Sequence, residues 1–236
     1  MIVDRVKRRL HREIVADPVA HALVLNLYLN GERYPHRVDD YFPIAAADDP
    51  VLADRMARHA REEDKHVALY AKAVRSLGQP VLELPLADVF NEVIRAHTPV
   101  AFRMEQGDDA DARRTKLAHF LAHAHFLEKR VARSLEYHLE ACAGAASPYP
   151  AKAVGLVLAD EHEHVRYTRE AVLALLPHAR ATEVLAVHER AEARANFDFS
   201  ARQMRQLLGR RAASFSRASR ALYRACGAVM KVALHA

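Results

Sequence analysis

The sequence predicts an all-α protein that folds as a single domain. Its 236 residues include only seven Gly and no Trp, and long stretches are rich in Ala, Leu, Arg and Glu, which favour helices. At 51% hydrophobic residues the chain can bury a substantial core, and no linker divides residues 1–236 into separate domains. We therefore expect a four-helix bundle over about residues 18–176, with accessory helices at the amino and carboxyl ends.

Capping residues, prolines and glycines place the expected helices in order along the chain. A short charged helix covers residues 1–15. Asp17 and Pro18 then open the first bundle helix, which is expected to run towards Phe42 and Pro43. The later helices are expected over residues 50–77, 87–96, 109–143, 150–176, 182–208 and 212–233.

The segment over residues 79–107 determines the topology of the bundle. Short turns before residues 50 and 150 predict two antiparallel helical hairpins. If the third bundle helix runs parallel to the second, this segment must recross the length of the bundle, and about 30 residues suffice for that. We therefore expect two antiparallel hairpins joined by a long crossover.

Two short sequence motifs contain the residues that are most informative about function. They are Glu63-Asp64-Lys65-His66 and Glu161-His162-Glu163-His164. Each has a Glu three residues before a His, so a carboxylate and an imidazole lie on one face of a helix. Another acid precedes each motif, Glu62 in the first and Asp160 in the second. This pattern is typical of metal ligands.

The wider spacing adds one further Glu to each motif. Glu32 lies 31 residues before Glu63, and Glu128 lies 33 residues before Glu161. The midpoint of each interval falls on an expected turn, so the two Glu of each hairpin lie at the same level. At 1.5 Å per residue each carboxylate is roughly 23 to 25 Å from its own turn, and all four can meet halfway along the bundle.

The first of these residues has an unusual sequence context. Gly31 and Pro35 flank Glu32, and a proline inside a helix removes a backbone hydrogen bond. Glu32 could lie in a loop, but we expect a kink or bulge in a continuing helix, because such irregularities often mark functional sites.

The six residues resemble the ligand set of the ferritin-like diiron-carboxylate superfamily. That superfamily includes rubrerythrins, acyl-carrier desaturases, bacterial multicomponent monooxygenases and tRNA hydroxylases. The resemblance covers about residues 18–176 and implies a dimetal site inside the bundle. The implied ligands are Glu32, Glu63, His66, Glu128, Glu161 and His164, with Glu63 and Glu161 as the bridging candidates.

The same resemblance assigns a role to the acid that precedes each motif. In the monooxygenase-like branch this acid binds the metal-bound imidazole of the other motif, which pairs Asp160 with His66 and Glu62 with His164. Such a partner fixes the imidazole tautomer and raises its basicity. That branch usually carries Asp at both positions, whereas this chain has one Glu and one Asp.

Charge and ligand type indicate which metals and reactions would suit the site. Four carboxylates balance the charge of two divalent ions, so the reduced centre can lie in an apolar interior. Oxygen and imidazole ligands suit two iron ions, with manganese or a mixed Mn/Fe pair as alternatives. We expect a non-haem diiron oxidoreductase that activates O2 to oxidise or hydroxylate an organic substrate, supplied by an external electron donor.

The sequence also allows three alternative interpretations of these residues. The first is a ferroxidase or other iron-handling protein, and the second is a tRNA-modifying hydroxylase. The third is a buried polar cluster that holds no metal, although six unpaired polar side chains would be costly.

Several further residues have the right spacing to approach the site. His125 lies three residues before Glu128 and is a candidate for an extra ligand, whereas His119 and His123 are expected to be solvated. Three tyrosines at helical spacing from the ligands are expected to be core or rim aromatics, namely Tyr28, Tyr70 and Tyr167.

The tail and the cysteines bear on partners and location. Residues 199–236 contain seven Arg, one Lys and no acid, so a basic amphipathic helix could bind RNA, an acidic protein or an anionic surface, or simply pack on the bundle. Two isolated cysteines, no signal core and no membrane-spanning stretch favour a cytoplasmic protein. The oligomeric state stays open, with a dimer as one option.

Overall fold

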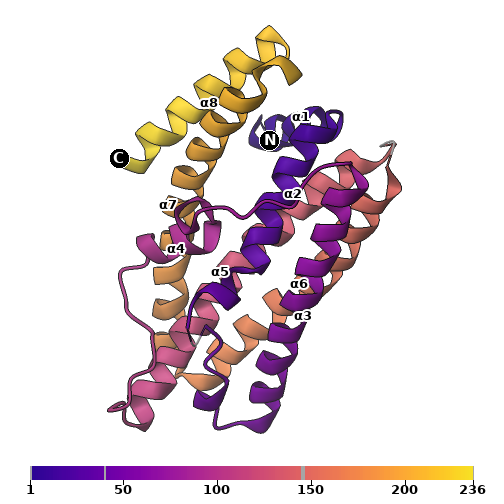
Figure 1. Ribbon diagram of the computed structural model, residues 1–236. Coiled ribbons are helices and arrows are strands. Elements are labelled where there is room, and N and C mark those ends of the chain that lie inside the picture. Colours follow the sequence, from indigo (N-terminus) through magenta and orange to yellow (C-terminus); the bar gives the residue numbers. More distant parts are fainter. Residues whose placement is uncertain (1, 40, 145–146, 236) are drawn as a thin grey trace.

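The computed structural model describes residues 2–39, 41–144 and 147–235, and within these residues the fold is entirely helical (Figure 1). The expectation of an all-α protein is confirmed. The helices are α1 (Ile2–Val15), α2 (Pro18–Glu32), α3 (Pro50–Ser76), α4 (Phe90–His97), α5 (Ala110–Cys142), α6 (Pro148–Leu175), α7 (His178–Arg211) and α8 (Arg217–His235). Short 3-10 turns cover Tyr34–Arg37, Ile44–Ala46, Leu86–Asp88 and Ala212–Ser214.

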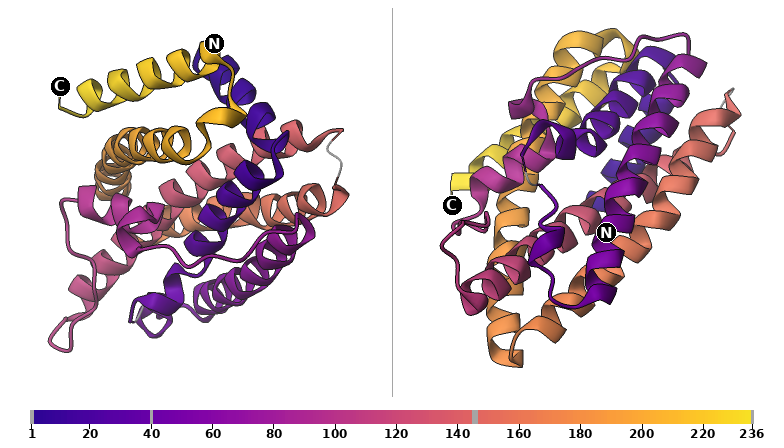
Figure 2. Two further views of the ribbon diagram at one scale, coloured as in Figure 1. Left: turned by 45° about the horizontal axis from the view of Figure 1, so that its top comes forward. Right: turned by 60° about the horizontal axis from the view of Figure 1, so that its bottom comes forward.

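Four of these helices pack side by side and carry the residues of interest. The pairs α2 and α3, α5 and α6, and α3 and α6 are in contact. The ribbon shows α2 and α3 running in opposite directions, as do α5 and α6, while α3 and α5 run in the same direction (Figures 1 and 2). Helix α1 packs along α5, and α7 packs against α5, α4 and α8.

The segment between α3 and α5 is held to the bundle by two buried asparagines of α2. The Asn26 side chain accepts a hydrogen bond from Leu82 N at 2.7 Å and donates one to Pro80 O at 3.2 Å. One turn later, Asn30 accepts from Leu84 N at 2.9 Å and donates to Leu82 O at 2.9 Å. These amide side chains take the place of a strand partner, because the extended segment has no sheet to pair with.

Capping residues begin α2, α3 and α5 where the sequence predicts, whereas α7 begins four residues before its expected start at 182 and α8 five residues after its expected start at 212. The carboxylate of Asp17 accepts from Val19 N and that of Asp49 accepts from Val51 N, so α2 and α3 each begin at the proline that follows. Asp109 caps α5 in the same way, 2.8 Å from the backbone nitrogen of Ala112.

Glycines mark the ends of α3 and α5. Gly78 and Gly144 have φ angles of 70° and 94°, a left-handed conformation that favours glycine. The expectation that Gly144 terminates its helix is confirmed, while the rest of that expected turn, at 145–146, lies outside the described residues. Helix α6 begins at Pro148, two residues before the expected start.

The expectation of a kinked first bundle helix was wrong. Helix α2 ends at Glu32, and a 3-10 turn over Tyr34–Arg37 follows it. Pro35 has no N–H to donate to the carbonyl of Gly31, so the α-helical ladder stops there. Glu32 is therefore helical but lies in the last turn, with its side chain buried.

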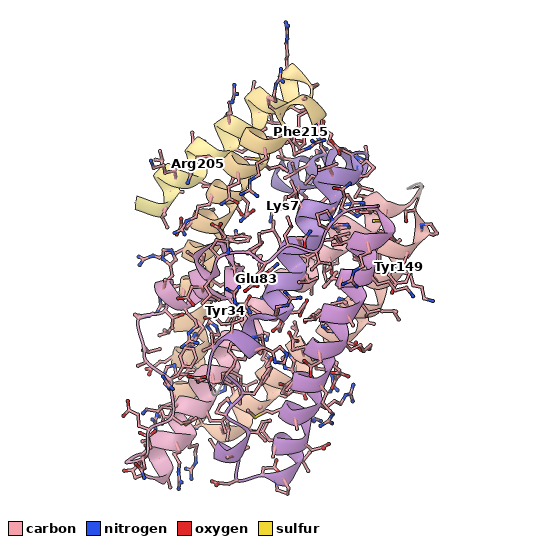
Figure 3. The ribbon with its side chains drawn as sticks, viewed as in Figure 1. Lys7, Tyr34, Glu83, Tyr149, Arg205 and Phe215 are labelled. Atoms are coloured by element: carbon pink, nitrogen blue, oxygen red, sulfur yellow. The ribbon has the colours of Figure 1, made fainter. Side chains whose placement is uncertain are left out.

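The tail packs on the body of the protein through side chains of α8 and of the residues just before it. Phe215 lies between α8 and the amino-terminal helices, where it contacts the cluster around Ile14 (Figure 3). Tyr223 and Ser219 are fully buried and both donate to the Glu13 carboxylate, at 3.0 and 2.7 Å. Val229, two turns nearer the carboxyl end of α8, is 67% exposed.

The length and hydropathy of the described helices bear on whether any of them could cross a membrane. None of them combines the length and the apolarity that a bilayer crossing requires.

Candidate metal centre

All six residues of the expected ligand set lie together inside the four packed helices. Glu32 comes from α2, Glu63 and His66 from α3, Glu128 from α5, and Glu161 and His164 from α6. Their exposed fractions range from 0 to 6%, so the whole set is withdrawn from solvent. Convergence from four helices requires that each helix present the correct face at the same level, as the sequence spacing predicts.

Two carboxylates lie between the two imidazoles. Glu161 places one oxygen 3.5 Å from His66 Nδ1 and the other 3.2 Å from His164 Nδ1. Glu63 Oε1 is 4.0 Å from His66 Nδ1 and 3.9 Å from His164 Nδ1. Glu32 Oε2 approaches His66 Nδ1 at 3.5 Å. Both imidazoles therefore direct Nδ1 towards a common group of oxygens.

The outward nitrogens of these imidazoles are held by the acids that precede the motifs. His66 Nε2 is 3.1 Å from Asp160 Oδ2, and His164 Nε2 is 3.0 Å from Glu62 Oε2. Each acid thus contacts the imidazole of the other motif, which is the pairing that the resemblance implies. An Nε2–H that donates to a carboxylate leaves the Nδ1 lone pair directed into the cluster.

Basic side chains hold these two acids in their ionised form. Lys65 Nζ donates to Asp160 at 2.6 Å, and Arg58 Nε donates to Glu62 at 2.9 Å. Burial opposes ionisation of both acids, but their contacts with the imidazoles and with these cations outweigh it and lower each pKa. The imidazole orientation is thereby coupled to charges at the surface of the bundle.

A seventh residue, His59, joins the cluster and was missed by the sequence reasoning. Its Nε2 lies 3.1 Å from Glu63 Oε1 and 3.7 Å from Glu128 Oε1, which is the contact that brings Glu128 into the group. Its ring stacks on that of His164 at a centroid distance of 3.6 Å, and its Nδ1 forms a 2.7 Å hydrogen bond with the hydroxyl of Tyr167. Because His59 precedes Glu63 by four residues, helical periodicity alone could have identified it.

Polar atoms inside the cluster lack partners. Among the described residues, no hydrogen-bond partner is found for Nε2 of His59, Oε1 of Glu63, Nδ1 of His66 or Oε1 of Glu161. A buried polar atom without a partner costs about 1–3 kcal/mol, and more if it is charged. Cations bound among these atoms would satisfy them at once, so the residues present fit a metal-ion site.

The electrostatics of the protein without metal point in the same direction. Burial, together with the charges of neighbouring carboxylates, raises the pKa of Glu63 and Glu161 well above the usual range and that of Glu128 to about 8. Burial likewise lowers the pKa of His59 and His164, so both imidazoles are neutral near pH 7. Neutral imidazoles are the form that binds metal ions, and divalent cations would restore the ionised carboxylates.

One candidate ligand of α5 lies outside the cluster, and the expectation of a solvated His123 was wrong. His125 does not join the cluster, because α5 turns its ring away and Nδ1 lies 2.9 Å from the carbonyl oxygen of Val165. His123 is completely buried rather than solvated, with its ring 5.1 Å from that of Phe102 between centroids. His119 is half-buried and pairs with His188.

The three tyrosines are buried or half-buried aromatics, as expected, but each also lies near a histidine or glutamate of the interior. The hydroxyl of Tyr70 is buried without a hydrogen-bond partner among the described residues, and burial and the charge of Glu32 raise its pKa. Tyr167 bonds His59, and the Tyr28 hydroxyl lies 3.3 Å from His138 Nδ1.

A surface pocket of about 240 Å³ adjoins the cluster. It is lined by residues between Pro35 and Phe42 and by Ala60, Arg61 and Asp64 of α3. Phe42 lines the pocket, and its ring also packs edge-on against His59 at a centroid distance of 5.0 Å.

Comparisons of the chain with protein-family models, with curated proteins and with solved structures found no match.

The buried His and Glu residues of the cluster form two groups, and within each group the ligand atoms all lie within 4.8 Å of one another. These are His59, Glu63 and His164 in one group, and Glu32, Glu63, His66 and Glu161 in the other. Groups of this kind could hold a metal ion.

Proposed function

We propose that this chain is a ferritin-like dimetal-carboxylate protein whose centre holds two iron ions and activates O2 to oxidise or hydroxylate an organic substrate. The observation that supports it is the buried cluster of four Glu and three His from four helices, with unpartnered polar atoms at its centre. The two overlapping donor groups share Glu63, which suits a pair of neighbouring ions.

The charge of the cluster fits this proposal. Four carboxylates offset two divalent ions, so a reduced centre would be neutral in a site from which water is excluded. Carboxylate oxygen and imidazole nitrogen suit Fe(II), with Mn(II) as the alternative, whereas structural zinc sites usually recruit thiolates. A bound iron pair would supply electrons to O2.

The residues of the chain would divide the remaining tasks. His66 and His164 offer Nδ1 while Asp160 and Glu62 keep the proton on Nε2. Glu161 and Glu63 lie between the two imidazoles and would contribute oxygens to both ions. The pocket beside Phe42 would admit a substrate, and displacement of that ring would open the route to His59.

Iron stoichiometry tests the proposal and separates it from iron storage. The purified chain is loaded with Fe(II) without oxygen, analysed for metal, and then exposed to air while its absorption spectrum is recorded. We expect two Fe per chain and a spectral change on exposure to air that consumes O2. Iron that accumulates far beyond two per chain would instead identify an iron-storing protein, and no bound iron would leave a metal-free cluster.

Variants of the imidazoles make the test specific to the site. His66→Ala and His164→Ala should each lose most of the bound iron, because each removes a ligand and leaves charged neighbours unpaired. His162→Ala is the matched control, since that side chain lies between the motif residues of α6 but is 60% exposed. Unchanged stoichiometry in both ligand variants would count against the assignment.

A further inference from the structure

A second cluster of potential ligands lies at another level of the bundle. His21 of α2 faces His138 and Cys142, which are one turn apart on α5. Ten residues of α5 separate Glu128 from His138, so the two clusters are roughly 15 Å apart along the helix. No residue is shared between them.

The three side chains are closely grouped and buried. Their exposed fractions are 2% for His21, 0% for His138 and 5% for Cys142. One nitrogen of each imidazole and the sulfur of the cysteine all lie within 4.8 Å of one another. The Nε2 atoms of the two histidines face each other at 2.8 Å.

We propose that His21, His138 and Cys142 bind a single zinc ion that is separate from the dimetal centre. Zinc favours four-coordinate sites built from imidazole nitrogen and thiolate sulfur. With Zn–N distances of about 2.0–2.1 Å, two nitrogens on a tetrahedral ion are roughly 3.3 Å apart. The two Nε2 atoms would need to separate by about half an ångström, which small side-chain rotations can provide.

His11 of α1 lies next to this group but outside the set of atoms within 4.8 Å of one another, so it would have to move closer to bind the ion. The His11 ring lies 5.7 Å from that of His138 between centroids, and its buried Nδ1 has no hydrogen-bond partner among the described residues. It is the candidate for the fourth ligand. If zinc binds Nε2 of His138, the proton stays on Nδ1, which can donate to the Tyr28 hydroxyl 3.3 Å away.

Burial acts in opposite senses on the imidazoles and on the thiol of this group. Burial lowers the pKa of His11 and His21 to about 4, so both imidazoles are neutral and able to bind an ion. Burial raises the pKa of the Cys142 thiol to about 11, so zinc binding would release its proton.

A hydrogen bond between the two Nε2 atoms explains part of the cluster without metal. It assigns no role to the Cys142 sulfur, however, and leaves the His11 nitrogen unpartnered. A zinc ion would use all four donors and would tie α1 and α2 to the end of α5.

Cobalt provides a probe that detects thiolate ligation alone. The full chain is freed of metal with a chelator and titrated with Co²⁺, whose bond to a thiolate gives an intense near-ultraviolet charge-transfer band. We expect Co²⁺ to produce this band with an intensity that corresponds to one thiolate-bound ion per chain, and excess Zn²⁺ to remove it. Carboxylate and imidazole ligands do not produce the band, so binding at the dimetal centre is silent in this experiment.

Variants assign the band to the proposed ligands. Cys142→Ser should abolish it, whereas Cys226→Ser, which removes the other free cysteine of the chain, should retain it. Tyr28→Phe removes the partner of His138 Nδ1 and should weaken Co²⁺ binding roughly 10–100-fold. Circular dichroism verifies that each variant is folded.

The wild-type titration is decisive by itself. A folded chain that shows no thiolate band at saturating Co²⁺ overturns the proposal, and so does a band that survives in Cys142→Ser. Neither result depends on iron loading of the dimetal centre, so failure of this inference is distinguishable from failure of the proposed function.

Discussion

His59 occupies a position in the centre that the two Glu-x-x-His motifs do not describe. It enters from the turn of α3 that precedes Glu63 and adds a third imidazole to the group. Its Nδ1 is engaged by Tyr167, which leaves Nε2 directed at the oxygens of Glu63 and Glu128. One side of the cluster is therefore richer in nitrogen than the sequence motifs alone indicate.

Removing this imidazole tests whether it binds metal. We expect His59→Ala to weaken Fe(II) binding at least tenfold, a loss of about 1.4 kcal/mol, because one ligand is removed from a buried site. Anaerobic Fe(II) titration measures the affinity, with His162→Ala as the exposed control. If both variants bind iron as the unmodified chain does, His59 is a packing residue.

The acids outside the imidazoles permit a second test at this scale. Glu62→Ala and Asp160→Ala remove the partners of His164 and His66 and should weaken metal binding roughly 10–100-fold without abolishing it at saturation. Glu163→Ala is the matched control, because Glu163 pairs with Arg166 on the outer face of α6. An affinity in either acid variant equal to that of the control would contradict an orienting role.

At the scale of elements, the path of the chain between α3 and α5 depends on side chains of α2. The segment around residues 80–84 is extended, so its backbone groups need partners from elsewhere. Asn26 and Asn30, one turn apart, supply donors and acceptors to alternate residues of the segment. This contact lets the chain return along the bundle, so that α5 can run in the same direction as α3.

Breaking the second of these contacts should destabilise the fold measurably. Asn30→Ala leaves Leu84 N and Leu82 O without their partner, and each unpaired group costs about 1–3 kcal/mol. Since the site is partly buried, we expect a loss of about 2 kcal/mol in the free energy of unfolding, measured by urea denaturation.

Thr182→Ala provides the comparison for that measurement. Its hydroxyl donates to His178 O within α7 at an exposed position, so its loss should change stability by less than about 0.5 kcal/mol. Equal stabilities of the two variants would show that the asparagine contacts are dispensable.

For the molecule as a whole, the buried acids couple folding, pH and metal binding. A carboxyl with a pKa higher in the folded than in the unfolded state keeps its proton where the unfolded chain has lost it. Stability therefore falls as pH rises from the unfolded towards the folded pKa. Histidines with a lowered pKa act in the opposite sense, but only below their usual pKa of about 6.5. His66, whose pKa Glu32 and Asp160 raise despite its burial, acts in the same sense as the carboxyls above that pH.

In the metal-free chain, the effect of the raised carboxyl pKa values on stability is therefore best measured between pH 7 and pH 8. Glu128, with a pKa of about 8, still holds its proton over most of this window, and the pKa values of Glu63 and Glu161 are raised in the same direction. We expect the free energy of unfolding to drop by on the order of 1 kcal/mol between pH 7 and pH 8 from Glu128 alone. Above pH 8 the effect is opposed by Lys7, whose pKa burial lowers to about 8.

Denaturation of metal-free and iron-loaded protein at both pH values provides the measurement. The loaded protein should lack the drop, because its carboxylates are bound to cations, and Glu128→Gln should show a smaller one. The prediction fails if the metal-free and loaded proteins respond to pH identically.

The sequence by itself determined the helices and the convergence of the six ligand candidates. Caps such as Asp49 and terminators such as Gly78 act within a few residues, so local sequence suffices to place them. The distances from Glu32 to Glu63 and from Glu128 to Glu161 follow from a fixed rise per residue on either side of a turn. Helix caps, terminating glycines and the rise per residue are all set by local backbone geometry.

Only the tertiary structure decided which neighbouring faces turn inward. His125 shares a side of α5 with Glu128, yet the packing of α6 engages it at the carbonyl of Val165, whereas His59 is turned into the cluster. The grouping of His21 with Cys142 likewise joins residues 121 positions apart. Helical periodicity states which residues lie together on one helix, but the rotation of each helix about its axis is set by its neighbours.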